Sequence, residues 1–504
     1  MTSDHPRTGA RVSSGAVTPA FPPVPLGTLV AAVPDAIIRG DGSVLVTDVA
    51  FDSREASPGA LFFCVPGLQV DGHTFAAAAV EAGAAALIVE RWLGVDAPQA
   101  LVPSVRRAMG PLSAVAFGRP ASAMATVGIT GTNGKTTVSY LLASIFRAAG
   151  WTPGVVGTTG AAVGDEAVAL ARTTPEAPDL HRLLAQMRDR GVGGAALEVS
   201  SHALAQSRVD GVVFDVAVFT NLSQDHLDFH ETMEAYFAAK ARLFTPEHAV
   251  RAVVNVDDPA GARLAEGASI PTDTFGTGVA AGLRAQDVVV SRDGIRFAVD
   301  GLQVRSRLRG AFNVENVLAA MAAARVLGIK DAAIERGVAA LGEVPGRMEP
   351  IEAGQDFLVV VDYAHTPDSI RSVLRASRPL TSGRLILVFG CGGDRDRAKR
   401  SPMGAAATAN ADLSVITTDN PRSEDPLKII AEIEPGAAQG GGAWMVEPDR
   451  RAAIRLALRE AAPGDVVILA GKGHEPMQEF REETVPFDDR VVAREELEAM
   501  GSHA

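Results

Sequence analysis

The chain has 504 residues, too many for a single hydrophobic core, so several domains are expected. An apolar fraction of 47% and a charged fraction of 21% are typical of globular proteins and exclude a mainly disordered chain. The net charge of −13 argues against a nucleic-acid partner, because binding to a phosphate backbone needs a basic surface. We therefore expect a folded protein that binds anionic ligands only locally.

Targeting signals are missing from the sequence. The first two dozen residues lack the apolar stretch of about 7–15 residues found in secretory signals, and we expect residues 1–24 to form a disordered tail. No apolar run approaches the roughly 18 residues of a membrane span. Cys64 and Cys391 form neither a disulfide framework nor a zinc-binding spacing. These features predict a cytoplasmic protein without a membrane partner.

Strand-like apolar runs alternate with amphipathic helical stretches, which predicts an α/β fold with parallel sheets covered by helices on both faces. One helix is expected to bury a stripe at i, i+3, i+4 spacing and to end at Gly150. Its members are Val138, Leu141, Leu142, Ile145, Phe146 and Ala149. The glycine-rich segment 435–443 is expected to be a flexible loop.

Glycine and proline near residues 118–120 and 345–346 mark two domain boundaries. We expect three domains, at 25–122, 123–345 and 346–504. The central one would be a P-loop domain with a mainly parallel sheet, and the last a doubly wound Rossmann-like domain.

A dense polar cluster follows each of at least seven apolar runs in the last two-thirds of the chain. The clusters are TGTNGKTT, SSHAL, TNLSQDHLDFH, DYAHT, GCGGDRDRAKR, DNPR and GKGHE. In open α/β sheets, ligands bind outside the carboxyl ends of the strands. We expect two such sheet edges to face one cleft.

The first cluster has the context of a phosphate-binding loop, since it joins a strand to the helix described above. Its members are Gly131, Thr132, Asn133, Gly134, Lys135, Thr136 and Thr137. Glycines let backbone N–H groups surround phosphate oxygens, Lys135 would reach the β- and γ-phosphates, and the Thr136 hydroxyl would bind Mg²⁺. The usual spacing is not met, because Ile129 occupies the place of the first glycine. A glycine-rich turn without a ligand is the alternative.

Three further residues allow two interpretations each. Glu198 is either a Mg²⁺ ligand or a solvated charge at a strand end. His226, among Asp225, Asp228 and His230, suits a metal site as well as a hydrogen-bonded loop. Lys240, in a helical stretch, would by default be an exposed lysine.

The last third of the chain concentrates arginine. Arg395, Arg397, Lys399 and Arg400 follow one strand, and Arg422 follows another. Arginine binds carboxylates through two parallel hydrogen bonds, so this domain could hold a substrate with a free carboxylate. The alternative is a solvated surface network with Asp394 and Asp396.

Together the motifs resemble those of the Mur ligases of peptidoglycan synthesis, over about residues 45–490. The matching motifs are GTNGKTT, EVSSHAL, TNLSQDHLDFH, AYFAAKARLF, FNVENVLAA, VPGRME and DYAHTPD. GCGGDRDRAKR, DNPR and GKGHE narrow the resemblance to the MurE type, which adds the third amino acid of the peptide. This resemblance implies a uridine-nucleotide domain, an ATPase domain and an amino-acid-binding domain, in that order.

The resemblance also implies roles for individual residues. The phosphate loop would bind ATP together with Asn316, Arg347 and Asp362. The UDP end of the first substrate would meet Phe51, Ser53, Leu68, Gln69 and Val70. Its muramoyl-dipeptide part would meet Thr173, Thr174, Ser200, Gln206 and Arg208. Catalysis would involve Lys135, Glu198, His226 and a Lys240 carbamylated by CO₂, and Mg²⁺ would contact Thr136, Glu198, His226 and that Lys240.

The DNPR motif implies meso-diaminopimelate as the incoming amino acid, since the lysine-adding relatives lack this arginine. Its site would comprise Arg395, Asp419, Asn420, Pro421, Arg422, Gly471 and Glu475. Arg422 and Arg395 would hold the second carboxylate of diaminopimelate, and Gly471 and Glu475 its distal ammonium group.

The resemblance therefore implies an ATP-dependent ligase that joins meso-diaminopimelate to UDP-N-acetylmuramoyl-L-alanyl-D-glutamate through an acyl phosphate. We expect a monomer. Three alternatives stay open: a lysine-adding ligase, a ligase similar to folylpolyglutamate synthase, and a non-catalytic nucleotide-binding regulator. Arg422, the segments DSR and DGH, and the presence of Lys135, Glu198 and Lys240 respectively argue against them.

Overall fold

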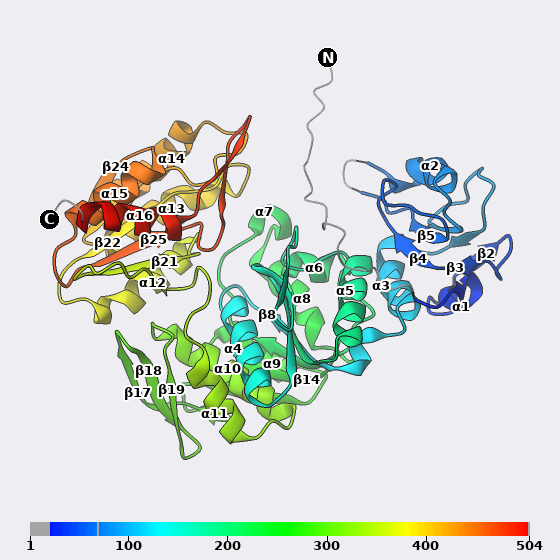
Figure 1. Cartoon of the computed structure of the whole chain (residues 1–504), viewed down its shortest axis with the longest axis horizontal. Coiled ribbons are helices and arrows are strands. Elements are labelled where there is room, and N and C mark those ends of the chain that lie inside the picture. The colour runs from blue at the N-terminus through cyan, green and yellow to red at the C-terminus, as the bar shows by residue number, and fades with distance from the viewer. Residues whose placement is uncertain (1–20, 68–69, 502–504) are drawn as a thin grey trace.

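The computed structural model describes residues 21–67 and 70–501, and the chain forms three successive α/β regions (Figure 1). The N-terminal region, in blue, and the C-terminal region, in yellow to red, lie on opposite sides of the central one. In the part of the chain that is described, no helix is long and apolar enough to cross a membrane.

The N-terminal region is built on a five-stranded sheet of order β2-β7-β6-β5-β4, parallel except at the β2 edge. Its strands are β1 (Val24–Pro25), β2 (Ile37–Arg39), β3 (Leu45–Val46), β4 (Asp48–Ala50), β5 (Ala60–Phe63), β6 (Ala86–Val89) and β7 (Gln99–Leu101). Its helices are α1 (Leu26–Val30), η1 (Gly72–Phe75), α2 (Ala76–Glu81) and α3 (Val105–Ala116).

A tail is expected over residues 1–24, of which residues 1–20 lie outside the described part and residues 21–24 are described. Phe21 is buried and meets the Phe117 ring edge-on, with centroids 5.0 Å apart, and Val24 begins β1. The buried Phe21 ring therefore packs this segment against the N-terminal region, contrary to the disorder expected for residues 21–24.

The central region contains a nine-stranded sheet of order β11-β10-β9-β12-β8-β13-β14-β15-β16, in which only β10 runs opposite to the other strands. Its strands are β8 (Ala125–Thr130), β9 (Thr152–Gly157), β10 (Gly160–Val163), β11 (Glu166–Val168), β12 (Val192–Glu198), β13 (Phe214–Phe219), β14 (Ala249–Asn255), β15 (Thr272–Gly276) and β16 (Leu283–Arg284). A small antiparallel sheet follows, formed by β17 (Gln286–Ser291), β18 (Gly294–Val299) and β19 (Leu302–Ser306).

Helices cover both faces of this central sheet, as the alternating pattern predicts. Helices α4, α10 and α11 pack on one face, and α5, α6, α8 and α9 on the other. The helical elements are η2 (Pro120–Ala123), α4 (Lys135–Ala148), α5 (Ala177–Asp189), α6 (Ser201–Ala205), α7 (Leu227–His230), α8 (Met233–Ala241), η3 (Arg242–Phe244), α9 (Pro259–Gly267), α10 (Phe312–Val326) and α11 (Asp331–Ala340). The predicted apolar stripe of α4 is buried, and Gly150 follows the helix at φ +84°.

The C-terminal region is a doubly wound domain with sheet order β20-β21-β25-β22-β23-β24, parallel except for β20. Helices α12, α13 and α14 cover one face and α15 and α16 the other. The strands are β20 (Glu349–Pro350), β21 (Leu358–Asp362), β22 (Leu385–Phe389), β23 (Leu413–Ile416), β24 (Ala443–Val446), β25 (Val466–Ala470), β26 (Met477–Glu479) and β27 (Thr484–Pro486). The helices are α12 (Pro367–Ser377), η4 (Arg378–Leu380), η5 (Arg397–Lys399), α13 (Arg400–Asn410), α14 (Pro426–Gly440), α15 (Arg450–Glu460) and α16 (Asp489–Gly501).

The prediction of a loop over residues 435–443 is wrong for most of that segment. Helix α14 continues through Pro435 to Gly440, and β24 begins at Ala443. A Cβ on Gly436 would lie 1.8 Å from the Ser401 carbonyl oxygen, so this glycine allows α14 to approach α13 closely. The glycines here serve helix packing rather than flexibility.

All seven apolar runs that precede polar clusters are strands, and they form two groups of parallel neighbours. Strands β12, β8 and β13 are adjacent in the central sheet, and β21, β25, β22 and β23 in the C-terminal sheet. The clusters at their carboxyl ends therefore gather at one edge of each sheet.

Candidate active site

The phosphate loop between β8 and α4 is shaped by two glycines with positive φ. A Cβ on Gly131 (φ +143°) would lie 1.9 Å from Thr220 Oγ1, and one on Gly134 (φ +87°) 2.3 Å from Asn316 Oδ1. Only glycine fits either position. The predicted nucleotide residue Asn316 thus lies directly against the loop, and the remaining loop residues, Thr132, Asn133, Thr136 and Thr137, lead into α4.

Two lysines converge on one carbonyl of this loop. Lys135 Nζ donates to the Gly131 oxygen (3.0 Å) and the Thr132 oxygen (2.9 Å), and Lys240 Nζ donates to the Gly131 oxygen (2.8 Å). Lys240 is only 1% exposed, so it is not the exposed helix lysine that composition alone suggests. Burial, together with the nearby Lys135 charge, holds the Lys240 pKa well below its usual value, while Asp225 opposes this shift. The Lys240 amine is therefore poised to be neutral and nucleophilic.

Glu198, at the end of β12, is 1% exposed and is not a solvated strand-end charge. The Thr158 backbone N–H donates to its Oε1 (3.0 Å) and the Thr158 hydroxyl to its Oε2 (3.0 Å). Both oxygens retain lone pairs, so the carboxylate can accept further hydrogen bonds or a cation.

The residues expected to meet the muramoyl dipeptide form one hydrogen-bonded group beside Glu198. The Thr174 hydroxyl donates to the Glu198 carbonyl oxygen (2.8 Å), and Thr173 and Thr158 hydroxyls lie 3.2 Å apart. Ser200 caps α6 and lies 3.4 Å from the Thr174 hydroxyl. The structure thus joins this group to the strand that carries Glu198.

Arg208 completes the group and ties it to the N-terminal region. It donates to the Thr174 carbonyl (3.2 Å) and to Gln206 Oε1 (2.6 Å), and its Nε lies 3.1 Å from Glu176. Glu176 also pairs with Arg106 of α3 (3.0 Å). One carboxylate therefore connects a candidate substrate residue with a helix of the preceding region.

The residues expected near the UDP end are only partly described. Phe51 and Ser53 follow β4 and are half-buried, and Val70 is 55% exposed, whereas Leu68 and Gln69 lie outside the described residues. Arg182 of α5 donates to the Val49 carbonyl (3.0 Å), which holds the end of β4 beside the central region.

The start of the C-terminal region reaches back to the phosphate loop. Arg347 Nη2 donates to the Thr136 hydroxyl (3.1 Å), and its guanidinium lies 4.5 Å from the Tyr363 ring centroid. Asp362 accepts from the backbone N–H groups of Met348 (2.8 Å) and Ala364 (2.9 Å). Burial raises the Asp362 pKa, and Arg347 opposes the increase. Asp362 thus fixes the segment that carries Arg347.

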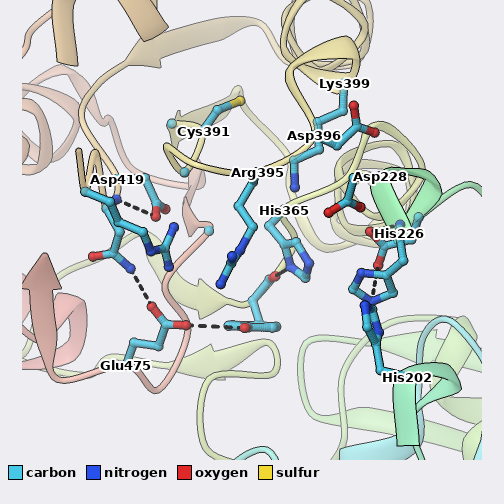
Figure 2. Close-up of a pocket in the computed structure, with 17 residues that line it drawn as sticks. His202, His226, Asp228, His365, Cys391, Arg395, Asp396, Lys399, Asp419 and Glu475 are labelled. Carbon is cyan, nitrogen blue, oxygen red and sulfur yellow. Dashed lines mark hydrogen bonds and ion pairs between the residues drawn. The ribbon is translucent and has the colours of Figure 1, made fainter. Parts of the chain in front are cut away.

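A cavity of about 380 Å³ lies between the central and C-terminal regions. All predicted acceptor-site residues except Pro421 line it, and His226 lines it from the central side. Figure 2 shows His226 and Asp228 on one side, Asp419 and Glu475 on the other, and Arg395 between them. The lining residues are His202, Asp225, His226, Asp228, Tyr363, His365, Gly390, Cys391, Gly392, Arg395, Asp396, Lys399, Asp419, Asn420, Arg422, Gly471 and Glu475.

Some basic residues of the GCGGDRDRAKR cluster line the cavity, and others form ion pairs within the C-terminal region. Arg395 and Lys399 line the cavity. Arg400 is 1% exposed and pairs with Glu424 (2.8 Å) and Glu432 (2.8 Å). Arg397 also pairs with Glu432. Arg400 therefore joins α13 to α14, Arg397 joins η5 to α14, and neither of these two arginines lines the cavity.

Arg422 is partly compensated inside the protein. Its Nε lies 2.7 Å from Glu479 Oε2, and its Nη1 donates to the Gly393 carbonyl (2.9 Å). Its φ is +51°, a strained value for arginine, which aims the side chain across the loop after β22. The guanidinium has five N–H groups, so donors remain for a ligand carboxylate.

On the opposite wall, the His226 ring is held in a polar aromatic cluster. Its Nε2 lies 3.3 Å from Asp225 Oδ2, and its ring meets the His202 ring edge-on at 4.8 Å. Burial lowers the His226 pKa to about 3, although Asp225 opposes the shift. The imidazole is therefore neutral at physiological pH, and its free lone pair can coordinate a cation.

Several cavity residues were not assigned a role from sequence, notably His202, Tyr363, His365 and Lys399. Each belongs to one of the polar clusters that follow strands, so position in a cluster was the available signal. Among the described residues, no group of three or more His, Cys, Asp or Glu is already arranged to hold a metal ion.

Models of three Mur ligase domains match the chain. They are the Mur ligase family catalytic domain over residues 45–112, the Mur ligase middle domain over 129–324, and the Mur ligase glutamate ligase domain over 346–473. In these matches the phosphate loop lies in the middle domain, and the DNPR motif lies in the glutamate ligase domain.

Curated relatives are similar over nearly the full length. UDP-N-acetylmuramoyl-L-alanyl-D-glutamate–2,6-diaminopimelate ligase of Streptomyces avermitilis is 47% identical and covers 90% of this chain and 92% of its own. The enzyme of the same name from Geobacillus thermodenitrificans is 43% identical, covering 93% of this chain and 98% of its own.

Solved structures agree with these relatives. A structure of a UDP-N-acetylmuramoyl-L-alanyl-D-glutamate–2,6-diaminopimelate ligase is 36% identical, with a TM-score of 0.69, and covers 95% of this chain and 99% of its own. MurF ligase from Thermotoga maritima, solved in complex with ADP, shares the fold at 20% identity, with a TM-score of 0.59 and coverage of 91% and 98%. With three matching domain models and relatives above 40% identity, the chain belongs to the Mur ligase family.

Proposed function

We propose that this protein is an ATP-dependent ligase that joins diaminopimelate to UDP-N-acetylmuramoyl-L-alanyl-D-glutamate in peptidoglycan precursor synthesis. The observation that carries the proposal is the cavity between two regions, which combines His226 with Arg395, Arg422 and Glu475. This lining suits an amino acid that has a carboxylate in addition to its α-carboxylate. The cavity also lies next to a phosphate-binding loop. The curated relatives named above have this activity in their names.

The three regions would divide the substrates among them, with boundaries near residues 122 and 345. The N-terminal domain, through Phe51, Ser53 and the 68–70 segment, would hold the UDP end. The group around Thr174 and Arg208 would hold the muramoyl dipeptide, because it lies between that domain and Glu198. The D-glutamate end would then point toward the phosphate loop.

In the first step, the γ-carboxylate of D-glutamate attacks the γ-phosphorus of ATP, and the bond to the β–γ bridging oxygen breaks, giving an acyl phosphate and ADP. Negative charge grows on the transferring phosphoryl oxygens. Lys135, the backbone N–H groups of the loop and Arg347 are placed to stabilise that charge, because they converge on Thr136 and Gly131.

Mg²⁺ fits this site chemically, and Thr136 and Glu198 offer the hard oxygen donors that this ion prefers. His226 would complete the set, directly or through water. When bound, the ion supplies positive charge beside the phosphates. Lys240 can join as a donor only after modification: attack of its neutral amine on CO₂, with loss of a proton, forms a carbamate that carries a carboxylate-like negative charge.

In the second step, the amine of diaminopimelate attacks the acyl carbon, the tetrahedral intermediate collapses, and phosphate leaves. Arg422 and Arg395 would hold the carboxylate that diaminopimelate has and lysine lacks. Glu475 would meet the distal ammonium group, with Asp419 and Gly471 shaping the wall. His226 lines the same cavity from the central side.

The three alternative functions would require other residues or domains than those of this chain. A lysine-adding ligase would bring no second carboxylate for Arg422 and Arg395 to bind. A ligase similar to folylpolyglutamate synthase would not need the domain over residues 45–112, which we propose to hold the uridine nucleotide. A non-catalytic regulator would not need to retain Lys135, Glu198 and Lys240 together. We also propose that the protein works as a cytoplasmic monomer.

The decisive experiment measures phosphate release and product mass with ATP, the UDP-muramoyl dipeptide and either meso-diaminopimelate or L-lysine. Diaminopimelate is expected to give the UDP-tripeptide with a much higher kcat/KM than lysine. A preference for lysine would contradict the acceptor, and absence of ADP formation with both would contradict the ligase activity.

A further inference from the structure

Lys472 lies immediately behind the acceptor cavity, one residue after Gly471 at the end of β25, and does not line the cavity. Its side chain is 0% exposed. A buried ammonium group is costly unless hydrogen bonds and opposite charges compensate it. The contacts of Lys472 therefore indicate why a charge is present at this position.

Those contacts determine the orientation of the Asn420 amide. Lys472 Nζ donates to Asn420 Oδ1 (3.2 Å) and to the Met477 carbonyl, and the Glu479 N–H also donates to Asn420 Oδ1 (3.1 Å). With its oxygen held by two donors, Asn420 presents its Nδ2 to Glu475 Oε2 at 2.8 Å. An amide can adopt either of two orientations, and these donors select one.

The same lysine acts on Glu475 through its charge. Lys472 Nζ lies 3.8 Å from Glu475 Oε2, while the Tyr363 hydroxyl donates to Glu475 Oε1 at 3.3 Å. Burial and the neighbouring Asp419 raise the Glu475 pKa, and Lys472 is the cation that opposes them. Lys472 thus favours the ionised form of a carboxylate that faces the cavity (Figure 2).

Counting charges around Lys472 gives a simple balance. The charged groups that act on it are the carboxylates of Asp419, Glu475 and Asp489 and the guanidinium of Arg450. Arg450 and Asp489 are paired at 2.6 Å with both side chains fully buried. Three negative and two positive charges leave one negative charge, which a single ligand ammonium group would neutralise.

We propose that Lys472 is a positioning residue for the acceptor amino acid, which holds the Asn420 amide and the Glu475 carboxylate so that the cavity accepts one ammonium group. The inference rests on the proposed function and extends it to a side chain that touches no substrate. If Lys472 had a purely structural role, its replacement would change stability and would not selectively change binding of the acceptor amino acid.

The first test replaces Lys472 with methionine, which preserves length and apolar volume, and uses Lys428→Met as control because Lys428 is an exposed lysine on α14. The KM for diaminopimelate is expected to rise by about tenfold or more, because the Asn420 amide loses a hydrogen-bond donor and the Glu475 carboxylate loses a nearby positive charge. The kcat should change by less than about threefold, and the KM values for ATP and the UDP-dipeptide should stay the same. An unchanged KM for diaminopimelate, or an equal rise in all three KM values, would overturn the proposal.

A second test compares Glu475→Gln with the double variant Lys472→Met/Glu475→Gln, which loses one charge of each sign and so remains informative where the single lysine variant does not fold. If Lys472 acts through Glu475, the double variant should have the same KM for diaminopimelate as Glu475→Gln, within about twofold. Fully additive effects would refute the inference.

Assays of the parent enzyme distinguish failure of the proposed function from failure of the inference about Lys472. Absence of tripeptide formation by the parent would overturn the proposed function and this inference with it. An active parent whose lysine variants fail both tests would overturn the role of Lys472 alone.

Discussion

The two sides of the central cleft hold their basic side chains through different partners. On the nucleotide side, Lys135 and Lys240 both donate to the carbonyl oxygen of Gly131, a neutral acceptor. On the acceptor side, Arg422 pairs with Glu479 at 2.7 Å. Behind that wall, the fully buried pair Arg450 and Asp489 is also matched in charge.

This difference matches the charges of the ligands. Phosphate groups bring several negative charges, so a site in which neutral backbone carbonyls hold the Lys135 ammonium group is strongly stabilised when phosphate binds. An amino acid brings charges of both signs, so a site for it must be balanced in advance, or one end of the ligand is repelled. The structure thus suggests that the nucleotide side supplies binding and transition-state energy and the acceptor side supplies selection.

The largest test of this contrast is removal of Lys135. In Lys135→Ala, kcat for ADP formation should fall by about 10³-fold, because a cation aimed at the developing phosphoryl charge is lost from a water-poor site. Initial-rate assays with a coupled ADP readout measure it, and circular dichroism verifies the fold. A fall of only a few-fold would mean that charge on the nucleotide side is not limiting.

A smaller loss is expected for Lys240→Met, about 10²-fold in kcat, since it would remove a supporting ligand rather than a group in contact with the phosphates. In the parent, mass spectrometry under native conditions should detect a labile CO₂ adduct on Lys240, and removal of CO₂ from the buffer should lower the rate. Full activity of Lys240→Met would contradict the carbamate.

On the acceptor side, Arg422→Ala should raise the KM for diaminopimelate by about tenfold and leave the KM for ATP unchanged, because the arginine lies in the amino-acid cavity. Preference over lysine should shrink in parallel. Arg397→Ala is the matched control, since Arg397 pairs with Glu432 on the neighbouring surface and does not line the cavity. Equal losses for both substrates would place Arg422 outside the acceptor site.

The strands that lead to the two sheet edges could be predicted from the sequence. Each strand that precedes a polar cluster formed as expected, because β-branched runs and post-strand glycines are local signals. Parallel pairing then brought DYAHT, GKGHE, GCGGDRDRAKR and DNPR to one edge of the sheet in that order, although they are distant in the chain.

Sequence reasoning failed where a residue's partner is distant. Arg400 resembled Arg395 in the sequence, yet it is buried between Glu424 and Glu432, which belong to another helix and the loop before it. Segment 435–443 was predicted to be a loop because it is rich in glycine. These glycines instead allow two helices to pack closely, which is a requirement of the tertiary structure. Lys472 carried no local sign of its contact with Asn420.

The smallest effect concerns stability and has a defined sign. Burial in the folded state holds the Lys240 pKa well below 10.5, the ordinary value of a lysine side chain, so the unfolded chain binds a proton more readily than the folded protein. Stability is therefore lost as pH falls below 10.5 toward the folded-state pKa. Lys240→Met should be more stable than the parent, by about 1 kcal/mol at pH 7, because activity and stability conflict at this site.

Urea unfolding in CO₂-free buffer at pH 7 and pH 10 tests this difference, with the exposed Lys428→Met as the control that should match the parent at both values. The advantage of Lys240→Met should shrink at pH 10, where the unfolded lysine is itself partly neutral. Lys472→Met should behave in the opposite way and lose stability, because Lys472 is compensated by Glu475 and Asn420. A destabilised Lys240→Met would mean that the lysine on the nucleotide side is as well balanced as the one behind the acceptor, which would remove the contrast between the two sides.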